Sequence, residues 1–390
     1  MSTICVIKSR KYPIEEEDIV DGGTLNAQII VKELIKKGFN IEVFTRYEGN
    51  GRKMFNKPGI RIFRVPFIRS KKRNVLQRDY EEGCSFIKSV VSHSEFQPEK
   101  YICIHTHHWT SGVGLESFIP KQLKLIHTPH LLAIEKAYYN KLSFSSCIKA
   151  CEQALINRAN HVIALSKSEK EALIVKYGCN KEKIILAPNG VDSVFFKIPL
   201  PKKENINTLP LLFIGRRCRQ KGSDILLEAV KQISKKDIPI SLRLVGGSYG
   251  EANFDKLIES RIQKLLSSCV IKQFEEVSHN LIPSLIKDSL IYVQPSRYES
   301  QGVAILEAMA AGRIVIASNL PAISEYICHG KNGFLVDSEN SNALAKSIME
   351  LLINPEKSIL LARAARETAK NYTWSHMLKS ILPLFESNQI

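Results

Sequence analysis

The sequence predicts an α/β protein made of two doubly wound domains that face a cleft. Short apolar, β-branched runs alternate with amphipathic segments along the 390 residues. This pattern is typical of parallel sheets joined by right-handed helical crossovers. The alternation is present in both halves of the chain, and a polar Pro- and Lys-rich stretch without period separates them. That stretch is typical of a linker.

The first half contains seven strand-like runs, several of them almost wholly apolar, as expected of strands covered on both faces. They are TICVIKS, FNIEVFTR, IRIFRVPF, YICIHTH, LKLIHTPH, HVIALS and KIILAPNG. Amphipathic helix-like segments lie between them. TLNAQIIVKELIKKG is stopped by Gly38, and ALSKSEKEALIVKYG has Ser166 or Ser168 as its cap and Gly178 at its end.

The second half repeats the pattern with the strands LPLLFIGR, SLRLVGG, SLIYVQPS, IVIAS and GFLVD. Its helices are SDILLEAVKQISKK, VAILEAMAAG and SNALAKSIMELLINP. We therefore expect an N-terminal domain over 1–190, a linker over 191–208 and a C-terminal domain over 209–370, followed by a last helix over 371–390. Ligands of such sheets bind beyond the carboxyl ends of the strands, so functional residues are expected in the loops that follow strands.

Composition is that of a globular protein, with 44% hydrophobic and 24% charged residues. No apolar run reaches the roughly 18 to 20 residues of a membrane span, and MSTICVIKSR is too short and mixed for a signal peptide. Nine scattered cysteines form no metal-type pattern. These features favour a cytoplasmic protein with reduced thiols.

The net charge of +16 is uneven, because residues 46–78 hold eleven basic residues and one acid, Glu48. Such a block attracts anions, which include phosphorylated substrates, acidic lipid surfaces and nucleic acid. A solvated loop is the alternative. Since no nucleic-acid recognition motif accompanies the block, we expect no nucleic-acid partner.

A first glycine turn occurs in FIGRRCRQKGSDILLEA. Gly215 permits close approach of the backbone to a ligand. Arg216 and Lys221 then precede a helix that begins at Ser223, and two cations near a helix N-terminus can bind an anion. A surface loop with ordinary charges is the alternative. Neither the P-loop pattern nor G-x-G-x-x-G is present.

A second turn occurs in YVQPSRYESQGVAILEAMAAG, where Gly302 opens an Ala-rich helix whose free amides suit a phosphate. Glu299 and Glu307 would repel phosphate but can accept hydrogen bonds from neighbouring sugar hydroxyls. Two carboxylates around one anion site fit a nucleotide-sugar. Alternatively, Glu299 is only a helix-end charge and Glu307 a surface position, although the apolar neighbours of Glu307 argue for burial.

These residues resemble the retaining GT-B glycosyltransferases of family 4, in the branch of sucrose-phosphate synthases and mycothiol-type N-acetylglucosaminyltransferases. ESQGVAILEAMAAG is similar to the E-x7-E signature of that family and GRRCRQKG to its phosphate-gripping loop. The segments DGGTLNAQ, IHTHHWTSG, HTPHLLAIEK, APNGVD, LVGGSYG and NYTW also match the family in register. The fold that this implies has a C-terminal helix packing back on the N-terminal domain.

The resemblance implies transfer of a sugar, with glucose or N-acetylglucosamine favoured, from a UDP-linked donor to an acceptor hydroxyl with retention. The leaving diphosphate would itself take the acceptor proton, without a metal or other cofactor. The implied catalytic residues are His130, Arg216, Lys221 and Glu299. The implied donor contacts are Gly22, Gly23, Gly215, Arg216, Lys221, Glu299, Gln301, Gly302, Val303 and Glu307.

The histidines allow other interpretations. His130 could be a packed histidine at a strand end. His105, His107 and His108 suggest zinc, but alternation places His108 on the opposite face of the strand and no fourth ligand is evident. We therefore expect no metal site.

Other functions remain open at this stage. An epimerase or hydrolase would bind the same donor without an acceptor, and a silent sugar-nucleotide-binding protein would perform no chemistry. For a transferase, the basic block favours an anionic small-molecule acceptor. A membrane-surface enzyme that acts on a lipid acceptor, with peripheral contact to anionic membrane, is the alternative.

Overall fold

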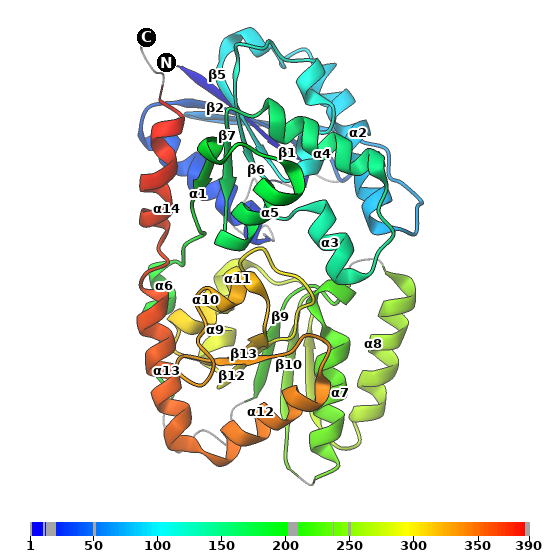
Figure 1. The fold of residues 1–390 in the computed structure, drawn as a ribbon, viewed down its shortest axis with the longest axis vertical. Coiled ribbons are helices and arrows are strands. Elements are labelled where there is room, and N and C mark those ends of the chain that lie inside the picture. The colour runs from blue at the N-terminus through cyan, green and yellow to red at the C-terminus, as the bar shows by residue number, and fades with distance from the viewer. Residues whose placement is uncertain are drawn as a thin grey trace. The chain divides into compact units, whose positions relative to one another are not determined.

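Two compact units make up the protein in the computed structural model (Figure 1). The described residues are 2–10, 12, 21–49, 52–201, 210–236, 238–248 and 251–386. Unit 1 combines Met1–Pro188 with Ser375–Ile390, and unit 2 comprises Asn189–Trp374. The predicted linker contains the short helix α6 (Ser193–Phe196), and its residues 202–208 lie outside the described residues.

Unit 1 is built on an eight-stranded sheet with the order β3-β4-β2-β1-β5-β6-β7-β8. Its strands are β1 (Thr3–Lys8), β2 (Asn40–Arg46), β3 (Met54–Lys57), β4 (Ile60–Val65), β5 (Tyr101–His107), β6 (Lys124–Thr128), β7 (His161–Ala164) and β8 (Ile184–Leu186). All pairings are parallel except that of β3 with β4. The chain reverses its direction of travel across the sheet between β1 and β5, which makes that gap the switch point where ligands bind.

In the described ranges, six α-helices belong wholly or mostly to unit 1. They are α1 (Gly22–Lys36), α2 (Val75–Val91), α3 (Ala133–Asn140), α4 (Ser146–Arg158), α5 (Lys167–Tyr177) and α14 (Trp374–Ile381). Of the two predicted candidates, Ser166 and Ser168, it is Ser166 that caps α5: its hydroxyl accepts from the amide of Glu169 at 3.1 Å, and Gly178 ends that helix at φ +62°.

The C-terminal segment returns to unit 1, as predicted (Figure 1, red). The Lys124 ammonium donates to the carbonyls of Leu384 at 3.2 Å and Glu386 at 3.1 Å. The ring of Phe385 is buried and lies 5.3 Å from that of His105. Phe385 therefore adds to the core of the first unit.

A buried carboxylate fixes the start of α3. Leu132 at the N-cap has no capping side chain, and Glu152 of α4 accepts instead from the amide of Ala133 at 3.2 and 3.1 Å. It also accepts from the Tyr177 hydroxyl. Burial raises the pKa of Glu152 to about 8. The native protein therefore holds a proton here that the unfolded chain, with a carboxyl pKa near 4.3, releases.

We expect Glu152→Gln to flatten the pH dependence of stability. Because the native pKa is the higher one, Glu152 makes the wild type lose stability as pH rises from about 4.3 to about 8. Glutamine mimics the protonated carboxyl, so the stability of the variant relative to the wild type should increase as pH rises across that interval. Thermal melts from pH 5 to 8.5 measure the difference, with the exposed Glu99→Gln as control. A difference that stays constant with pH would contradict this account.

Unit 2 has a six-stranded, wholly parallel sheet with the order β11-β10-β9-β12-β13-β14. Its strands are β9 (Leu211–Ile214), β10 (Ser241–Val245), β11 (Val270–Phe274), β12 (Ile291–Gln294), β13 (Ile314–Ser318) and β14 (Phe334–Val336). The remaining helices are α7 (Ser223–Ser234), α8 (Ala252–Leu265), α9 (Ile282–Lys287), α10 (Val303–Ala310), α11 (Pro321–Ser324), α12 (Ser341–Ile353) and α13 (Pro355–Ala369). Its switch point lies between β9 and β12.

The predicted class of two doubly wound α/β domains is confirmed. Two strands, β3 and β11, were not predicted. In β3 only Phe55 is even partly buried, and β11 has no fully buried residue, so neither shows the apolar run expected of an internal strand. None of the helices in the described ranges combines the length and the apolar composition that a membrane crossing requires.

Candidate active site

The predicted donor residues of unit 2 gather at the switch point of its sheet. Residues 215–222 follow β9, and residues 295–302 follow the adjacent strand β12. The first loop carries Arg216 and Lys221 to the start of α7, and the second carries Glu299 to the start of α10. Parallel neighbouring strands end at the same edge, so the two loops meet although 78 residues separate Lys221 from Glu299.

Glycine is required at two positions of these loops. Gly222 adopts φ +71°, and a Cβ there would lie 1.9 Å from the carbonyl oxygen of Pro295. No side chain fits between the two loops at this position. Gly302 adopts φ +86° as the N-cap of α10, and the first amides of that helix have no intrahelical partner.

A buried arginine holds the loops together. Arg297 donates to both carboxylate oxygens of Asp224, at 2.9 and 2.8 Å, and to the carbonyl of Arg219 at 2.6 Å. Glu339 is a further partner at 2.9 Å. Burial lowers the pKa of Arg297, but the hydrogen bonds to Asp224 and Glu339 and the charges of these two acids together outweigh burial, so the net pKa is raised. Arg297 was not among the predicted site residues, because nothing in the neighbouring sequence distinguishes it from a surface cation.

Lys221 and Glu299 form the centre of the site. The Lys221 ammonium lies 2.7 Å from Oε1 of Glu299, and their side chains are 20% and 7% exposed. The Ser296 hydroxyl donates to the same oxygen at 2.7 Å, and it accepts in turn from the Gln294 amide at 2.9 Å. The carboxylate is therefore fixed in place while the ammonium keeps access to a ligand.

The second glutamate lies deeper. Glu307 lies in the second turn of α10 and is 4% exposed, and its Oε1 pairs with Nε2 of His279 at 2.7 Å. Its burial agrees with the apolar run VAILEAMAAG that surrounds it. The partner His279 was not among the predicted residues, and no recognised motif in its own segment points to it.

The side chain of Gln301 forms hydrogen bonds with the main chain of Asn189 rather than facing an open site. Its side-chain oxygen accepts from the amide of Asn189 at 2.7 Å and its nitrogen donates to the carbonyl of Asn189 at 3.1 Å. The Tyr326 hydroxyl donates to the main-chain carbonyl of Gln301 at 2.6 Å. Contact of Gln301 with the sugar donor stays a prediction. The hydrogen bonds of its side chain to Asn189 do not favour it.

The predicted residues of unit 1 lie at the other switch point, beside β1 and β5. Gly22 and Gly23 open α1, which Asp21 caps by accepting from the amide of Thr24 at 2.7 Å. A Cβ at Gly23 would lie 3.3 Å from the ring of His130. The glycine turn and the histidine are therefore neighbours, as their predicted roles require.

His130 is held in an unusual conformation by a second histidine. Its φ is +59°, and its Nε2 lies 2.9 Å from Nδ1 of His107, with the rings stacked. Burial, with the charge of Lys8, lowers the pKa of His130 well below its ordinary value, and burial likewise lowers the pKa of His107. Both rings are thus neutral, and one donates to the other.

The remaining histidines of this region have protein partners. His105 bonds to Thr128 at 2.9 Å, and His108 bonds to Thr110 at 2.7 Å. Within the ranges that the structure describes, no three His, Cys, Asp or Glu side chains are grouped so as to hold a metal ion.

Buried cations line the carboxyl edge of unit 1. Lys8 ends β1 and is almost fully buried. The Lys136 ammonium lies 3.3 Å from Oδ2 of Asp79, with both side chains buried. These positive charges come from outside the basic block that the sequence singled out.

The basic block itself is partly neutralised. Five of its ion pairs join Arg46 to Glu82, Arg61 to Glu42 and Glu95, Arg69 to Glu48, and Lys72 to Glu81. All but one of the acids in these pairs lie outside the block. Its charge is therefore lower in the fold than along the sequence.

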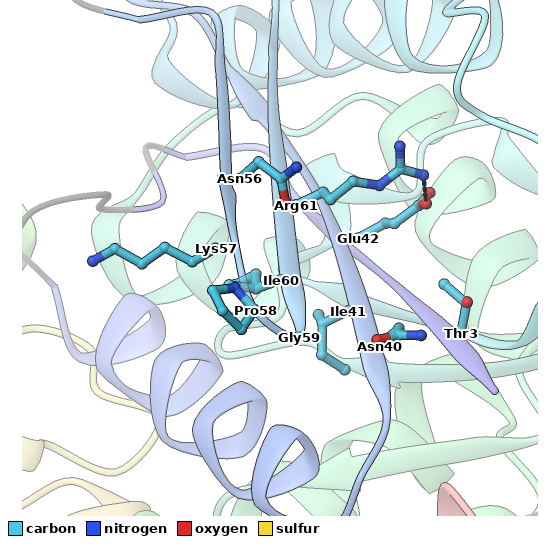
Figure 2. Close-up of a pocket in the computed structure, with 10 residues that line it drawn as sticks. All are labelled: Thr3, Asn40, Ile41, Glu42, Asn56, Lys57, Pro58, Gly59, Ile60 and Arg61. Carbon is cyan, nitrogen blue, oxygen red and sulfur yellow. Dashed lines mark hydrogen bonds and ion pairs between the residues drawn. The ribbon is translucent and has the colours of Figure 1, made fainter. Parts of the chain in front are cut away.

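A cavity of about 500 Å³ lies at the opposite, amino edge of the unit 1 sheet (Figure 2). Polar residues at the starts of β1, β2 and β4 line it, among them Asn40, Glu42 and Arg61. Glu42 pairs with Arg61 and accepts from the Tyr101 hydroxyl at 2.7 Å. None of the predicted site residues lines this cavity.

Two α/β units, each with polar loops suited to anions at the switch point of its sheet, are the arrangement expected of a GT-B glycosyltransferase. Comparisons with known proteins agree. Residues 192–370 match the family described as "Glycosyl transferases group 1", and residues 20–195 match "Glycosyltransferase Family 4". The chain belongs to family 4 of the glycosyltransferases, which use nucleotide sugars.

Relatives match along almost the whole chain. A D-inositol 3-phosphate glycosyltransferase of Pseudarthrobacter chlorophenolicus is 28% identical, with 95% of this chain and 92% of that protein covered. The protein of the same name from Corynebacterium urealyticum is 26% identical, covering 98% and 95%.

Solved structures share the fold. Sucrose-phosphate synthase from Thermosynechococcus elongatus superposes with a TM-score of 0.77 at 22% identity, covering 99% of this chain and 98% of the other. Anabaena HepE, solved in complex with UDP-glucose, gives 0.74 at 20% identity, covering 98% and 99%. These structures confirm the predicted GT-B fold, and the family models confirm the predicted family.

Proposed function

We propose that this enzyme transfers glucose or N-acetylglucosamine from a UDP-sugar to a hydroxyl of an anionic small molecule, with retention and without a metal. The carrying observation is the Lys221–Glu299 pair, held at 2.7 Å beside the open amides of α10. It joins a cation for the diphosphate to a carboxylate for sugar hydroxyls. The relatives named for inositol phosphate and the structure solved with UDP-glucose support the choice of substrates.

In this proposal the catalytic task is electrostatic. Lys221, Arg216 and the first amides of α10 stabilise the charge that grows on the leaving diphosphate. Glu299 holds the sugar, and Glu307 holds the ribose. The diphosphate takes the acceptor proton on the face that it leaves, which gives retention. His130, Gly22 and Gly23 keep their predicted roles toward the donor.

The acceptor is proposed to be anionic because of the buried cations Lys8 and Lys136 at the carboxyl edge of unit 1. Both ammonium groups contribute positive potential at the edge where ligands of such a sheet bind, which favours an acceptor that carries a phosphate. The nine free thiols favour work in the reducing cytoplasm.

Product analysis tests the function. Labelled UDP-glucose and UDP-N-acetylglucosamine are offered with inositol phosphates, sugar phosphates and their uncharged parents, with and without EDTA. A new α-linked glycoside on a phosphorylated acceptor, unaffected by EDTA, supports the proposal. Free sugar or an epimer formed regardless of acceptor would replace it by the hydrolase or epimerase alternative.

A membrane acceptor is the second candidate, favoured by apolar side chains exposed among the cations. Ile68 is 75% exposed and Met54 is 57% exposed. Ile68 adjoins Arg69, and the segment 71–73 is also basic and exposed. Such a surface could rest on anionic lipid.

We expect little binding to anionic vesicles at physiological salt, because ion pairs reduce the charge of this surface. Co-sedimentation with phosphatidylglycerol vesicles at low and physiological salt measures it. The control variants neutralise Arg69, Lys71, Lys72 and Arg73 one after another. Strong binding that weakens stepwise, by roughly 1 kcal/mol per charge, would make this a membrane-surface enzyme.

A further inference from the structure

His279 stands against the deeper of the two carboxylates in unit 2. It begins the short 3₁₀ helix His279–Leu281, in the loop that follows β11. Its Nε2 lies 2.7 Å from Oε1 of Glu307. The histidine side chain is 24% exposed and the glutamate only 6%. The imidazole is therefore the more accessible member of the pair.

The pairing occupies only part of the carboxylate. An ionised carboxylate has two oxygens and about four acceptor positions, and the hydrogen bond from His279 uses one of them on Oε1. Oε2 stays available for further donors. Two vicinal hydroxyls of a ribose are donors of the right kind and number.

Neighbouring groups hold the imidazole in place and favour its charge. The ring of Phe195 meets it edge-on at 5.9 Å between centroids. Burial lowers the pKa of His279, but the hydrogen bond to Glu307 and the charges of Glu307 and Asp192 outweigh burial and raise it overall. Glu307 belongs to α10 and Asp192 caps α6, so the acids that face His279 come from two elements of the described chain.

We propose that His279 is a positioning residue for the nucleotide: it fixes the Glu307 carboxylate in the orientation that accepts the ribose hydroxyls of the donor. This inference rests on the proposed function, because it takes Glu307 as the ribose carboxylate. It adds a residue that the E-x7-E pattern does not contain. Without His279 the carboxylate would be free to rotate, and the ribose would meet an unfixed acceptor.

Paired ligands separate this role from general support of the fold. UDP and 2′-deoxy-UDP are titrated by calorimetry against the wild type, His279→Ala, His279→Gln and the control His329→Ala, an exposed histidine elsewhere in unit 2. The wild type should prefer UDP by about tenfold or more, since hydrogen bonds to a charged group contribute about 1.5–3 kcal/mol. His279→Ala should lose most of this preference, whereas His329→Ala should keep it.

The pH profile gives a second readout. Each titration is repeated from pH 5.5 to 8.5, and the ratio of the two dissociation constants cancels the titration of the nucleotide phosphates. Because the protonated imidazole binds Glu307 more firmly, the wild-type preference should decline as pH rises through the pKa of His279. Glutamine still donates a hydrogen bond but cannot titrate, so His279→Gln should retain part of the preference at every pH without the decline.

Two results would overturn the inference alone. In one, His279→Ala weakens UDP and 2′-deoxy-UDP equally, which is the mark of a structural role. In the other, it leaves the preference for UDP intact. If the wild type binds none of UDP, GDP and ADP, the proposed function is wrong, and the inference, which rests on it, is wrong as well.

Discussion

Replacing Lys221 by alanine is expected to lower kcat/KM on the order of 10²-fold or more, with the fold intact. The ammonium lies at the switch point of the unit 2 sheet, 2.7 Å from Glu299 and only partly exposed. In the proposed reaction it neutralises charge that appears on the diphosphate only as the sugar leaves. Its loss should therefore reduce kcat more than it weakens donor binding.

The alanine variant also leaves the Glu299 carboxylate without its charged partner. Glu299 is buried, and after the change it retains only neutral partners such as the Ser296 hydroxyl. A buried charge without its partner is destabilising, so thermal melts must accompany the kinetics. Lys221→Arg should restore part of the rate, because it returns the positive charge.

A matched control is Lys231→Ala on the same helix, α7, where the lysine pairs with Glu228 on the surface. It should leave kcat/KM within about twofold, since exposed pairs contribute little. Steady-state kinetics with saturating acceptor measure all three variants. Wild-type turnover by a folded Lys221→Ala protein would remove Lys221 from the catalytic groups.

Local pattern was sufficient to predict most of the fold. Apolar β-branched runs report strands buried on both faces, and such runs marked β1, β5, β9 and β12, which flank the two switch points. Gly302 was predicted to open α10, and Ser166 or Ser168 to cap α5, because both effects depend only on nearby residues. The edge strands β3 and β11 lack the apolar signal, since none of their residues is fully buried.

The pairing of side chains could not be predicted in the same way. Sequence reasoning gave Lys221 and Glu299 separate tasks, whereas the structure joins them across 78 positions. His279 meets Glu307 across 28 positions, and Arg297 meets Asp224 across 73. Such contacts depend on which strands are neighbours, and strand order is a property of the whole sheet.

The basic block illustrates the same limit for charge. Counting residues between 46 and 78 predicts an anion-attracting surface. In the fold, Glu81 and Glu82 of α2 approach Lys72 and Arg46. Meanwhile Lys136, which the count did not include, is buried at the functional edge. Net charge along a segment is thus a weak guide to the field that a ligand meets.

Changing each glutamate to glutamine, which keeps the shape and removes the charge, should have different effects at the two positions. We expect Glu307→Gln to weaken binding of free UDP by about tenfold or more, because hydrogen bonds to a charged acceptor contribute about 1.5–3 kcal/mol. It should weaken the donor to the same extent, since the ribose is common to both. His279, 2.7 Å from Glu307, would then face a neutral amide.

Glu299→Gln should instead leave free UDP binding nearly unchanged, because UDP carries no sugar for this carboxylate to hold. Transfer should fall on the order of 10²-fold, since the hydroxyls of the reacting sugar lose a fixed, charged acceptor. Calorimetry with UDP and kinetics with the full donor measure both variants, and the exposed Glu259→Gln on α8 is the control. Equal losses of UDP affinity in the two site variants would contradict the division of roles. The different partners of the two carboxylates, Lys221 for Glu299 and His279 for Glu307, would then need another explanation.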